Sequence, residues 1–408
     1  MWSRACTQPQ DMSDPEVCSI PDASSCVVLP WQPDTAWFAS DLSVLGAGEF
    51  EACSRRILRR TLAKAADMGF QADFGTEAEF FVLKDGGEGG ASFSPLALNR
   101  PTLAKPAYDV SRVMDNMHWL GELVDYMNEL GWDVYSFDHE DGVGQFEIDF
   151  AFTDAISAAD RLVLLRWMSH EVARKHGGFA SWMPKPAGNM AGSGCHFNIS
   201  LGSADGSSKN LFKVAAGDPD EHGLGLSPLG YSFVAGMQRH LPAITAVSAP
   251  TVNSYKRLIA RGSNSGFTWA PIFQSWGGNN RSNTLRCNPG RVELRAADAA
   301  CNPYLAFAMC VAAGLEGIEQ NLKPPPPNEG NLFERMDGLT PAQCEAAGMG
   351  RLPTTLNEAV DAFEADPLSK QVFGDLMYDS WREFKRAEWA SYHDHVSQWE
   401  IDRYLKMY

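Results

Sequence analysis

The chain has 408 residues, of which 44% are hydrophobic, so it can bury a large core. Its formal net charge of −17 argues against a nucleic-acid-binding surface, because such surfaces depend on lysine and arginine at phosphates. No apolar run approaches the ~20 residues of a membrane span. The nine cysteines form no CxxC pair and the N-terminus lacks a hydrophobic signal core. Both features predict a reduced, intracellular protein, most simply a cytoplasmic one, with an organelle left open.

The first half of the chain predicts helices that alternate with strands. Residues 1–50 are rich in Pro, Ser and Asp, and they hold only two short strand candidates, Cys26–Leu29 and Ala36–Ala39. Beyond them, apolar residues recur with the helical period or the strand period. The predicted elements are a helix over 53–68, a strand over 72–83, a helix over 110–127, strands over 132–137 and 144–150, a helix over 154–176, and strands over 179–184 and 194–201.

The second half begins with a predicted helix over 228–247 and an irregular stretch over 260–283, followed by a strand over 291–297. Asn302-Pro303 is a strong helix start, with Asn as the N-cap and Pro at the first helical position. The proline run 324–327 ends that helix, and residues 355–408 predict a charged helical tail. The pattern predicts an α+β protein with an irregular segment at 1–50, a catalytic core at 51–323, and a linker with helices of the same domain at 324–408.

Three short stretches alternate charged or polar residues with apolar residues at a period of two. They are Glu77-Ala-Glu79, His196-Phe-Asn-Ile-Ser200 and Arg291-Val-Glu-Leu-Arg295. In a strand, residues i and i+2 point to the same face of the sheet. If these strands are neighbours, one face of the sheet carries carboxylates, an imidazole and guanidinium groups.

Two further groups of charged residues extend this face. Glu140 and Glu147 stand on either side of a glycine-containing turn, so two adjacent strands can bring both carboxylates together. Carboxylates with one imidazole suit Mg²⁺ or Mn²⁺ better than zinc. Four arginines lie within fifteen residues of an otherwise acidic chain: Arg281, Arg286, Arg291 and Arg295. Phosphoryl transfer needs such cations, so the set predicts an ATP-dependent, metal-assisted enzyme.

Each signal also has a simpler interpretation when it is taken alone. Glu-x-Glu on a strand is usually a solvated face, and a lone histidine is more often structural than a ligand. Arg291-Val-Glu-Leu-Arg295 can be an exposed ladder of ion pairs. The hypothesis of an active site therefore depends on the co-occurrence of these signals.

In order along the chain, the motifs resemble those of glutamine synthetase, from about Asp11 to Tyr408. The matching segments are Thr76-Glu-Ala-Glu79-Phe-Phe, Gly144-Gln-Phe-Glu147, Met183-Pro-Lys-Pro186, Gly192-Ser-Gly-Cys-His196, Asn253-Ser-Tyr-Lys-Arg257-Leu, Asn280-Arg281-Ser, Arg291-Val-Glu-Leu-Arg295 and Asn302-Pro-Tyr-Leu-Ala-Phe-Ala. The stretches that begin at Trp31 and at Trp132 resemble the type III, or glutamate–methylamine ligase-like, branch of that family.

The resemblance implies an antiparallel sheet that lines a funnel for ATP and two or more Mg²⁺ or Mn²⁺ ions, with helices packed outside. It implies metal ligands at Glu79, Glu140 and Glu147 for one ion, and at Glu77, His196 and Glu293 for the other. It implies a glutamate site at Gly192, Arg257 and Arg295, an ATP site at Asn198, Ser200, Arg286 and Arg291, and catalytic roles for Arg281 and Arg257.

The implied reaction forms γ-glutamyl phosphate from glutamate and ATP, after which an amine displaces phosphate. Ammonia is the default amine; the alternatives are an alkylamine such as methylamine, or a non-catalytic glutamine-synthetase-like protein. Three departures bear on this choice. Ser263 stands where the family has an acidic flap residue, and Ala191 stands where many members have Asn. The family's small N-terminal β-grasp domain, which helps to form a homo-oligomeric ring, is not apparent, so ring assembly is expected only with that domain.

Overall fold

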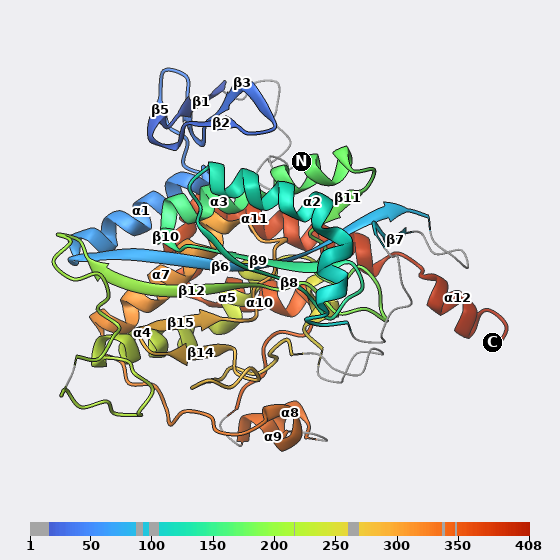
Figure 1. The fold of residues 1–408 in the computed structure, drawn as a ribbon. Coiled ribbons are helices and arrows are strands. Elements are labelled where there is room, and N and C mark those ends of the chain that lie inside the picture. Colours follow the sequence, from blue (N-terminus) through green and yellow to red (C-terminus); the bar gives the residue numbers. More distant parts are fainter. Residues whose placement is uncertain are drawn as a thin grey trace.

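A ten-stranded sheet runs through the centre of the molecule (Figure 1). The structure is a computed structural model that describes residues 16–86, 93–97, 106–215, 217–259, 269–336, 339–346 and 349–408. The main strands lie in the order β13 (Trp276–Gly277), β14 (Leu285–Asn288), β15 (Arg291–Leu294), β12 (Cys195–Ser203), β6 (Phe70–Asp85), β9 (Gln145–Phe150) and β8 (Val134–His139). The short strands β7 (Phe93–Pro95), β10 (Thr153–Asp154) and β11 (Phe179–Ser181) also pair with β6.

Antiparallel pairing dominates this sheet, since only β13 and β14 run parallel among the pairs described. The stretches with alternating residues are neighbours, as predicted, because β12 lies between β6 and β15. The alternation sorts side chains between two faces. Cys195, Phe197 and Ile199 of β12 are completely buried in the core, so His196 and Asn198 point to the opposite face.

Helices cover the apolar face of the sheet. Phe307 of α7 (Pro303–Glu319) stacks on Phe74 of β6, with ring centroids 4.0 Å apart. At the edge of β6 away from β12 lies β9, whose Phe146 packs edge to face against Trp119 of α2 (Val110–Glu129), with ring centroids 4.8 Å apart. These aromatic contacts join the helical layer to the central strands and account for the α+β fold.

Side chains cap the N-termini of two of these helices, and the cap at Asn302 was predicted from the sequence. Asp154 accepts a hydrogen bond from the Ser157 backbone at the start of α3 (Ala155–Lys175), and Asn302 does so at the start of α7. The remaining helices are α1 (Ser54–Asp67), α4 (Pro228–Arg239), α5 (Leu241–Ser248), α6 (Ser254–Arg257), α8 (Leu332–Arg335), α9 (Pro341–Ala346), α10 (Leu356–Ala365), α11 (Pro367–His393) and α12 (Gln398–Tyr404). Among the described residues, no helix is long and apolar enough to cross a membrane.

Several predicted elements differ from the structure, among them the strand expected over 179–184, which ends at Ser181 as β11. The helix expected over 228–247 is two helices, α4 and α5, separated at His240. Pro242 stands in the first turn of α5, and it can begin a helix there but has no N–H to continue α4. The strand expected over 291–297 ends at Leu294 as β15.

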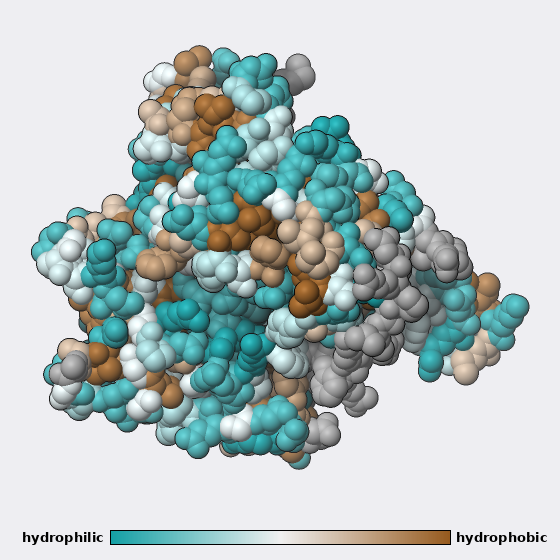
Figure 2. All heavy atoms as spheres, in the orientation of Figure 1, coloured by the Kyte–Doolittle hydropathy of each residue, from teal (hydrophilic) through white to brown (hydrophobic). Residues whose placement is uncertain are grey.

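The N-terminal segment contains more regular structure than the sequence suggested. Its described part forms β1 (Val17–Pro21), β2 (Val27–Leu29), β3 (Gln32–Trp37), β4 (Ser40–Val44), β5 (Gly48–Glu49) and a short 3₁₀ turn, Ala23–Ser25. These strands make one three-stranded and one two-stranded sheet, which stand apart from the main sheet (Figure 1). Figure 2 shows brown, hydrophobic patches among the paler and teal surface of this segment. Its exposed large apolar side chains are Ile20, Val28, Phe38 and Leu45. The expected division at residues 50 and 323 stays a prediction.

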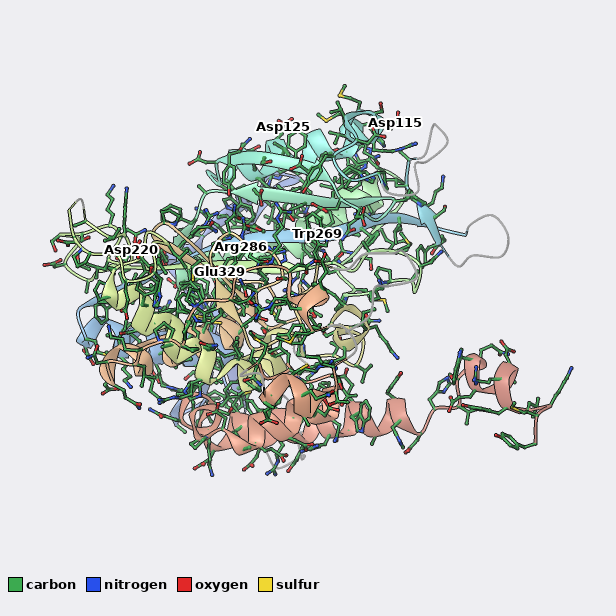
Figure 3. All side chains as sticks on the ribbon, turned by 90° about the horizontal axis from the view of Figure 1, so that it is seen from below. Asp115, Asp125, Asp220, Trp269, Arg286 and Glu329 are labelled. Atoms are coloured by element: carbon green, nitrogen blue, oxygen red, sulfur yellow. The ribbon has the colours of Figure 1, made fainter. Side chains whose placement is uncertain are left out.

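The C-terminal tail is helical, as predicted. The long α11 contains one break, at Gly374, whose φ of 73° is a backbone conformation that glycine adopts readily. The last helix, α12, extends away from the body of the molecule in two perpendicular views (Figures 1 and 3).

Candidate active site

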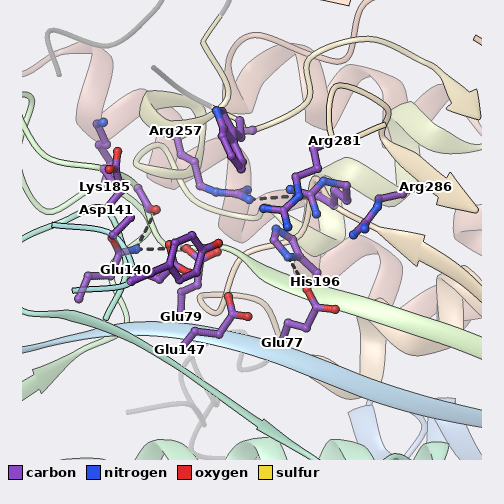
Figure 4. Close-up of a pocket in the computed structure, with 18 residues that line it drawn as sticks. Glu77, Glu79, Glu140, Asp141, Glu147, Lys185, His196, Arg257, Arg281 and Arg286 are labelled. Atoms are coloured by element: carbon purple, nitrogen blue, oxygen red, sulfur yellow. Dashed lines mark hydrogen bonds and ion pairs between the residues drawn. The ribbon is translucent and has the colours of Figure 1, made fainter. Parts of the chain in front are cut away.

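A cavity of about 430 Å³ opens on the polar face of the central sheet (Figure 4). It gathers side chains that are more than 200 positions apart in the chain, from Glu77 to Arg295. Ten of the predicted site residues line it: Glu77, Glu79, Glu140, Glu147, Gly192, His196, Arg257, Arg281, Arg286 and Arg295. The three alternating stretches therefore each contribute charged side chains to one cavity.

The first cluster in this cavity combines two carboxylates with an imidazole. His196 of β12 lies opposite Glu77 of β6 in the strand register, and its Nδ1 is 3.1 Å from Glu77 and 3.7 Å from Glu293. One ligand atom from each of the three residues lies within 4.8 Å of the others. Burial raises the pKa of Glu77, but hydrogen bonds from His196 and Asn198 bring it down to about 2. Glu77 is therefore charged, and the cluster can hold a divalent cation.

The second cluster contains three carboxylates: Glu79, Glu140 and Glu147. Glu79 and Glu147 face each other directly across β6 and β9. Burial and the charge of Glu79 raise the pKa of Glu140 to about 8, and the same causes raise the pKa of Glu147 well above its usual range. Like charges so close together repel one another unless a cation lies between them. Oxygen ligands of this kind suit Mg²⁺ or Mn²⁺.

Arginine side chains occupy the opposite side of the cavity. Arg257 donates hydrogen bonds to the backbone carbonyls of Arg295 and Ala296, at 3.1 and 3.0 Å. Arg286 and Arg295 both pair with Glu293, which is completely buried. These contacts fix the guanidinium groups before any ligand binds. Preorganised cations facing carboxylates can neutralise the charge of a transferred phosphoryl group.

Four predicted residues do not line the cavity. Glu293 lies beneath its wall and supports His196, Arg286 and Arg295. Asn198 donates a hydrogen bond to Glu77 at 2.8 Å, which places it beside the first cluster. Ser200 lies further along β12 opposite Asp73, and Arg291 is exposed at the end of β15. Ala191 does line the cavity, whereas Ser263 lies outside the described residues.

Several lining residues were not predicted to belong to the site. Gln145 and Lys185 stand inside quoted motifs, so their motifs could have indicated them. Gln145 donates hydrogen bonds to Glu79 and to the Gly192 carbonyl, at 3.1 and 3.0 Å, and so joins the second cluster to the glycine-rich segment. Tyr108 and Trp269 carried no signal, because each lies in a stretch with neither helical nor strand period.

Comparisons with known proteins agree with this geometry. The family model described as glutamine synthetase, catalytic domain, matches residues 51–404. A glutamine synthetase of Rhizobium leguminosarum bv. phaseoli is 39% identical over 392 residues, which cover 96% of this chain and 86% of that protein. A glutamate–methylamine ligase of Methyloversatilis universalis is 39% identical over 395 residues, with coverage of 97% and 86%.

A solved structure described as a GmaS/ADP complex superposes with a TM-score of 0.86 at 37% identity, covering 97% of this chain and 87% of that one. An apo GmaS structure gives a TM-score of 0.85 at 36% identity, with coverage of 99% and 88%. The match of the family model, over residues 51–404, includes every residue that lines the cavity. The chain belongs to the glutamine synthetase catalytic-domain family.

Proposed function

We propose that the protein is an ATP-dependent ligase that joins an amine to the γ-carboxylate of glutamate. The observation that carries this proposal is the cavity itself, where one cluster of metal-binding geometry and a second group of carboxylates share the space with preorganised arginines. Ammonia is the amine predicted from the sequence. Methylamine is the second candidate, because a relative of equal identity is a glutamate–methylamine ligase.

The carboxylate clusters would hold two divalent cations. Glu77, His196 and Glu293 would hold one, and Glu79, Glu140 and Glu147 the other; both sets offer the hard donors that Mg²⁺ and Mn²⁺ prefer. When bound, such ions neutralise phosphate oxygens and polarise the phosphoryl group.

The protein's own cations would position both substrates. Arg257, Arg295 and Gly192 would bind glutamate, and the first two are nearly buried, so their hydrogen bonds act in a medium of low dielectric constant. Asn198, Ser200, Arg286 and Arg291 would bind the nucleotide. Arg281, which lines the cavity, would stabilise the charge that develops on the transferred phosphoryl group.

The reaction would take two steps. An oxygen of the γ-carboxylate attacks the γ-phosphorus of ATP, ADP leaves, and γ-glutamyl phosphate forms. The neutral amine then attacks the carbonyl carbon, the bond to phosphate breaks, and a proton leaves the nitrogen. Arginine side chains assist the first step because they reduce the repulsion between an attacking anion and a polyanion.

Phosphate release from ATP tests the proposal. Purified protein is given glutamate with Mg²⁺ or Mn²⁺, and no amine, ammonia, methylamine and ethylamine are compared in parallel. Amine-stimulated release supports a ligase. The variant Glu293→Gln should lower it by about 10²–10³-fold, because it disturbs both the first cluster and two arginines. Glu319→Gln is the matched control, since Glu319 is exposed outside the cavity.

Two outcomes would contradict the proposal. If no amine stimulates phosphate release but calorimetry still detects ATP binding, the protein is a non-catalytic member of the family. Equal rates for Glu293→Gln and the wild type would show that this cavity is not the site of turnover. A homo-oligomeric ring and a cytoplasmic location stay predictions, and light scattering of the purified protein measures the former directly.

A further inference from the structure

Gln145, on β9, has an amide group that connects three separate segments of the chain. The residue lines the cavity, yet only 1% of its surface is exposed. Its Oε1 accepts a hydrogen bond from the backbone N–H of Gly142 at 2.9 Å. Its Nε2 lies 3.1 Å from Oε2 of Glu79 on β6 and 3.0 Å from the carbonyl of Gly192. The same Nε2 lies 3.1 Å from Oγ of Ser193, so no polar atom of this side chain is without a partner.

The hydrogen bonds to Glu79 leave one of its two oxygens for a ligand. Oε2 accepts from the Gln145 amide and, at 2.8 Å, from the backbone N–H of Gly194. Within the part of the chain that the structure describes, no donor reaches Oε1, and Glu79 lines the cavity. Hydrogen bonds to a charged carboxylate are stronger than those between neutral groups. Gln145 and Gly194 therefore hold Glu79 in one orientation before any cation binds.

The glycine-rich segment, Gly192-Ser-Gly194, has little side-chain contact of its own to fix it. A Cβ on Gly192 would lie 2.8 Å from both the Arg257 side chain and the Pro184 carbonyl. A Cβ on Gly194 would lie 2.7 Å from the Arg257 guanidinium group. Glycine is required by this space, but it also gives the backbone more conformational freedom than any other residue. The hydrogen bond from Gln145 to the Gly192 carbonyl reduces that freedom at the residue that we assign to glutamate.

Order at one end of the Gln145 amide therefore reaches the other end. A cation bound at the second carboxylate cluster would restrict the Glu79 side chain. Gln145, and through it the Gly192 carbonyl, would then have less freedom left to lose when glutamate binds. A ligand that binds a site which is already ordered loses less conformational entropy, so it binds more tightly. Such a coupling is reciprocal, because each ligand changes the affinity of the other by the same factor.

We propose that Gln145 is a positioning residue that couples cation binding to glutamate binding. Through its amide, a divalent cation at Glu79 tightens the binding of glutamate, and glutamate tightens the binding of that cation. The inference rests on the proposed ligase function, which names glutamate as the substrate. Couplings between sites typically change an affinity by about 5- to 150-fold. Direct attraction between the cation and a carboxylate of glutamate adds to the total, so the share of Gln145 is the difference between the wild type and a variant.

The test is the Kd of glutamate, measured by calorimetry with a chelator and again with saturating Mn²⁺, in the wild type and in Gln145→Met. Methionine has nearly the length of glutamine but neither an N–H nor a carbonyl group. We expect the ratio of the two Kd values to fall by about 10-fold in the variant. The Kd of Mn²⁺, measured with and without glutamate, should show the same fall. In turnover, the KM for glutamate should rise while the KM for ATP stays unchanged.

Three further variants serve as controls. Gln371→Met is the matched substitution, because Gln371 is exposed on α11 and does not line this cavity. Ser193→Ala removes one hydrogen bond of Gln145 but leaves the two that connect Glu79 with Gly192, so the coupling should remain. Gln145→Asn keeps the amide on a side chain that is one methylene shorter. It covers the case in which Gln145→Met fails to fold, and it should lose part of the coupling.

Three results would overturn the inference and leave the ligase proposal standing. If Gln145→Met weakens glutamate binding by the same factor with and without Mn²⁺, the residue shapes the site but couples nothing. If the wild type binds glutamate equally well under both conditions, Gln145 has no coupling to carry. If the KM for ATP rises together with that for glutamate, the substitution disturbs the cavity as a whole. Binding of neither glutamate nor Mn²⁺ by the wild type would instead remove the ligase proposal, and this inference with it.

Discussion

Two groups of buried charge in this molecule are built in opposite ways. Arg55 of α1 is 2% exposed and pairs with three carboxylates, Asp22, Asp41 and Asp160, at 2.8, 3.2 and 2.8 Å. In the cavity, Glu79, Glu140 and Glu147 face one another instead. The first group joins the N-terminal strands to the helical core through ion pairs, whereas the second brings three like charges together.

The direction of the pKa shifts expresses this difference. The pKa of Arg55 is raised: burial lowers it, but hydrogen bonds and charges from Asp160, Asp22 and Asp41 more than compensate, so its charged form is favoured. Burial and neighbouring carboxylates also raise the pKa of Glu140 and Glu147, which disfavours their charged form. A buried charge that is satisfied within the chain serves the structure. Buried like charges indicate a place for a ligand.

The largest expected effect comes from breaking the satisfied group. Arg55→Met would leave the buried Asp160 without its ion pair, while Asp22 and Asp41 keep the half-exposed Arg59, and we expect a loss of about 3–5 kcal/mol in the free energy of unfolding. Urea unfolding followed by circular dichroism measures it. Lys64→Met is the control: Lys64 forms an exposed ion pair with Glu319 at 3.4 Å, and its removal should cost less than about 1 kcal/mol. Equal losses in the two variants would contradict the distinction.

Supplying the cavity with its cation should have the next largest effect. Addition of Mn²⁺ or Mg²⁺ at about 100 times its dissociation constant should stabilise the metal-free protein by about 2.7 kcal/mol, seen as a higher melting temperature. The same ionic strength supplied as KCl is the control. An equal shift with KCl, or an undiminished shift in Glu147→Gln, would mean that the ion acts elsewhere.

Removal of one like charge should have a smaller and opposite effect to that of Arg55→Met. Glu147→Gln should stabilise the metal-free protein by about 1 kcal/mol, because like charges directly opposite on neighbouring strands repel. Chemical denaturation in the presence of a chelator tests this. Loss of stability in the metal-free variant would show that Glu147 has a structural partner, as Arg55 has.

A third buried charge, His240, should give the smallest effect. Its Nδ1 lies 2.7 Å from Asp366 of the α11 N-cap, and its Nε2 lies 3.3 Å from Glu316 of α7, which also pairs with Arg239. Burial lowers the pKa of His240, but these carboxylates raise it overall. The contribution of His240 to the free energy of unfolding is thus fully present below the unfolded-state pKa of about 6.5. It is lost as the pH rises through the pKa of His240 in the folded protein.

His240→Gln should therefore destabilise the protein by roughly 0.5–1 kcal/mol at pH 5.5 and by less at pH 9. Urea midpoints of the variant and the wild type at the two pH values give the comparison. A loss that is the same at both pH values would mean that the protonated imidazole contributes nothing beyond its packing.

Much of the site could be predicted from the sequence, because many of its residues lie on strands whose polar and apolar residues alternate. The alternation in β6 and β12 predicted that Glu77, Glu79 and His196 face the cavity, although Asn198 and Ser200 of the same pattern do not line it. The resemblance supplied Arg257, Arg281 and Arg286. The register of the strands could not be predicted from the sequence. Glu79 lies opposite Glu147 because of how β6 and β9 align, and these strands are far apart in the chain. Tyr108 and Trp269 were missed for a different reason. They lie in aperiodic segments, and only the folded chain brings them to Arg281.

The alternation along β12 has a consequence for how this gene can vary. His196 and Asn198 serve the cavity while Phe197 and Ile199 serve the core, and all four are neighbours in the chain. A codon inserted or deleted within this strand would exchange the two faces, and would place Phe197 in the cavity and His196 among the core side chains. Fold and site would then be lost in one event. Insertions and deletions should therefore accumulate in the loops between strands, where the number of residues does not decide which side chains face the cavity and which face the core.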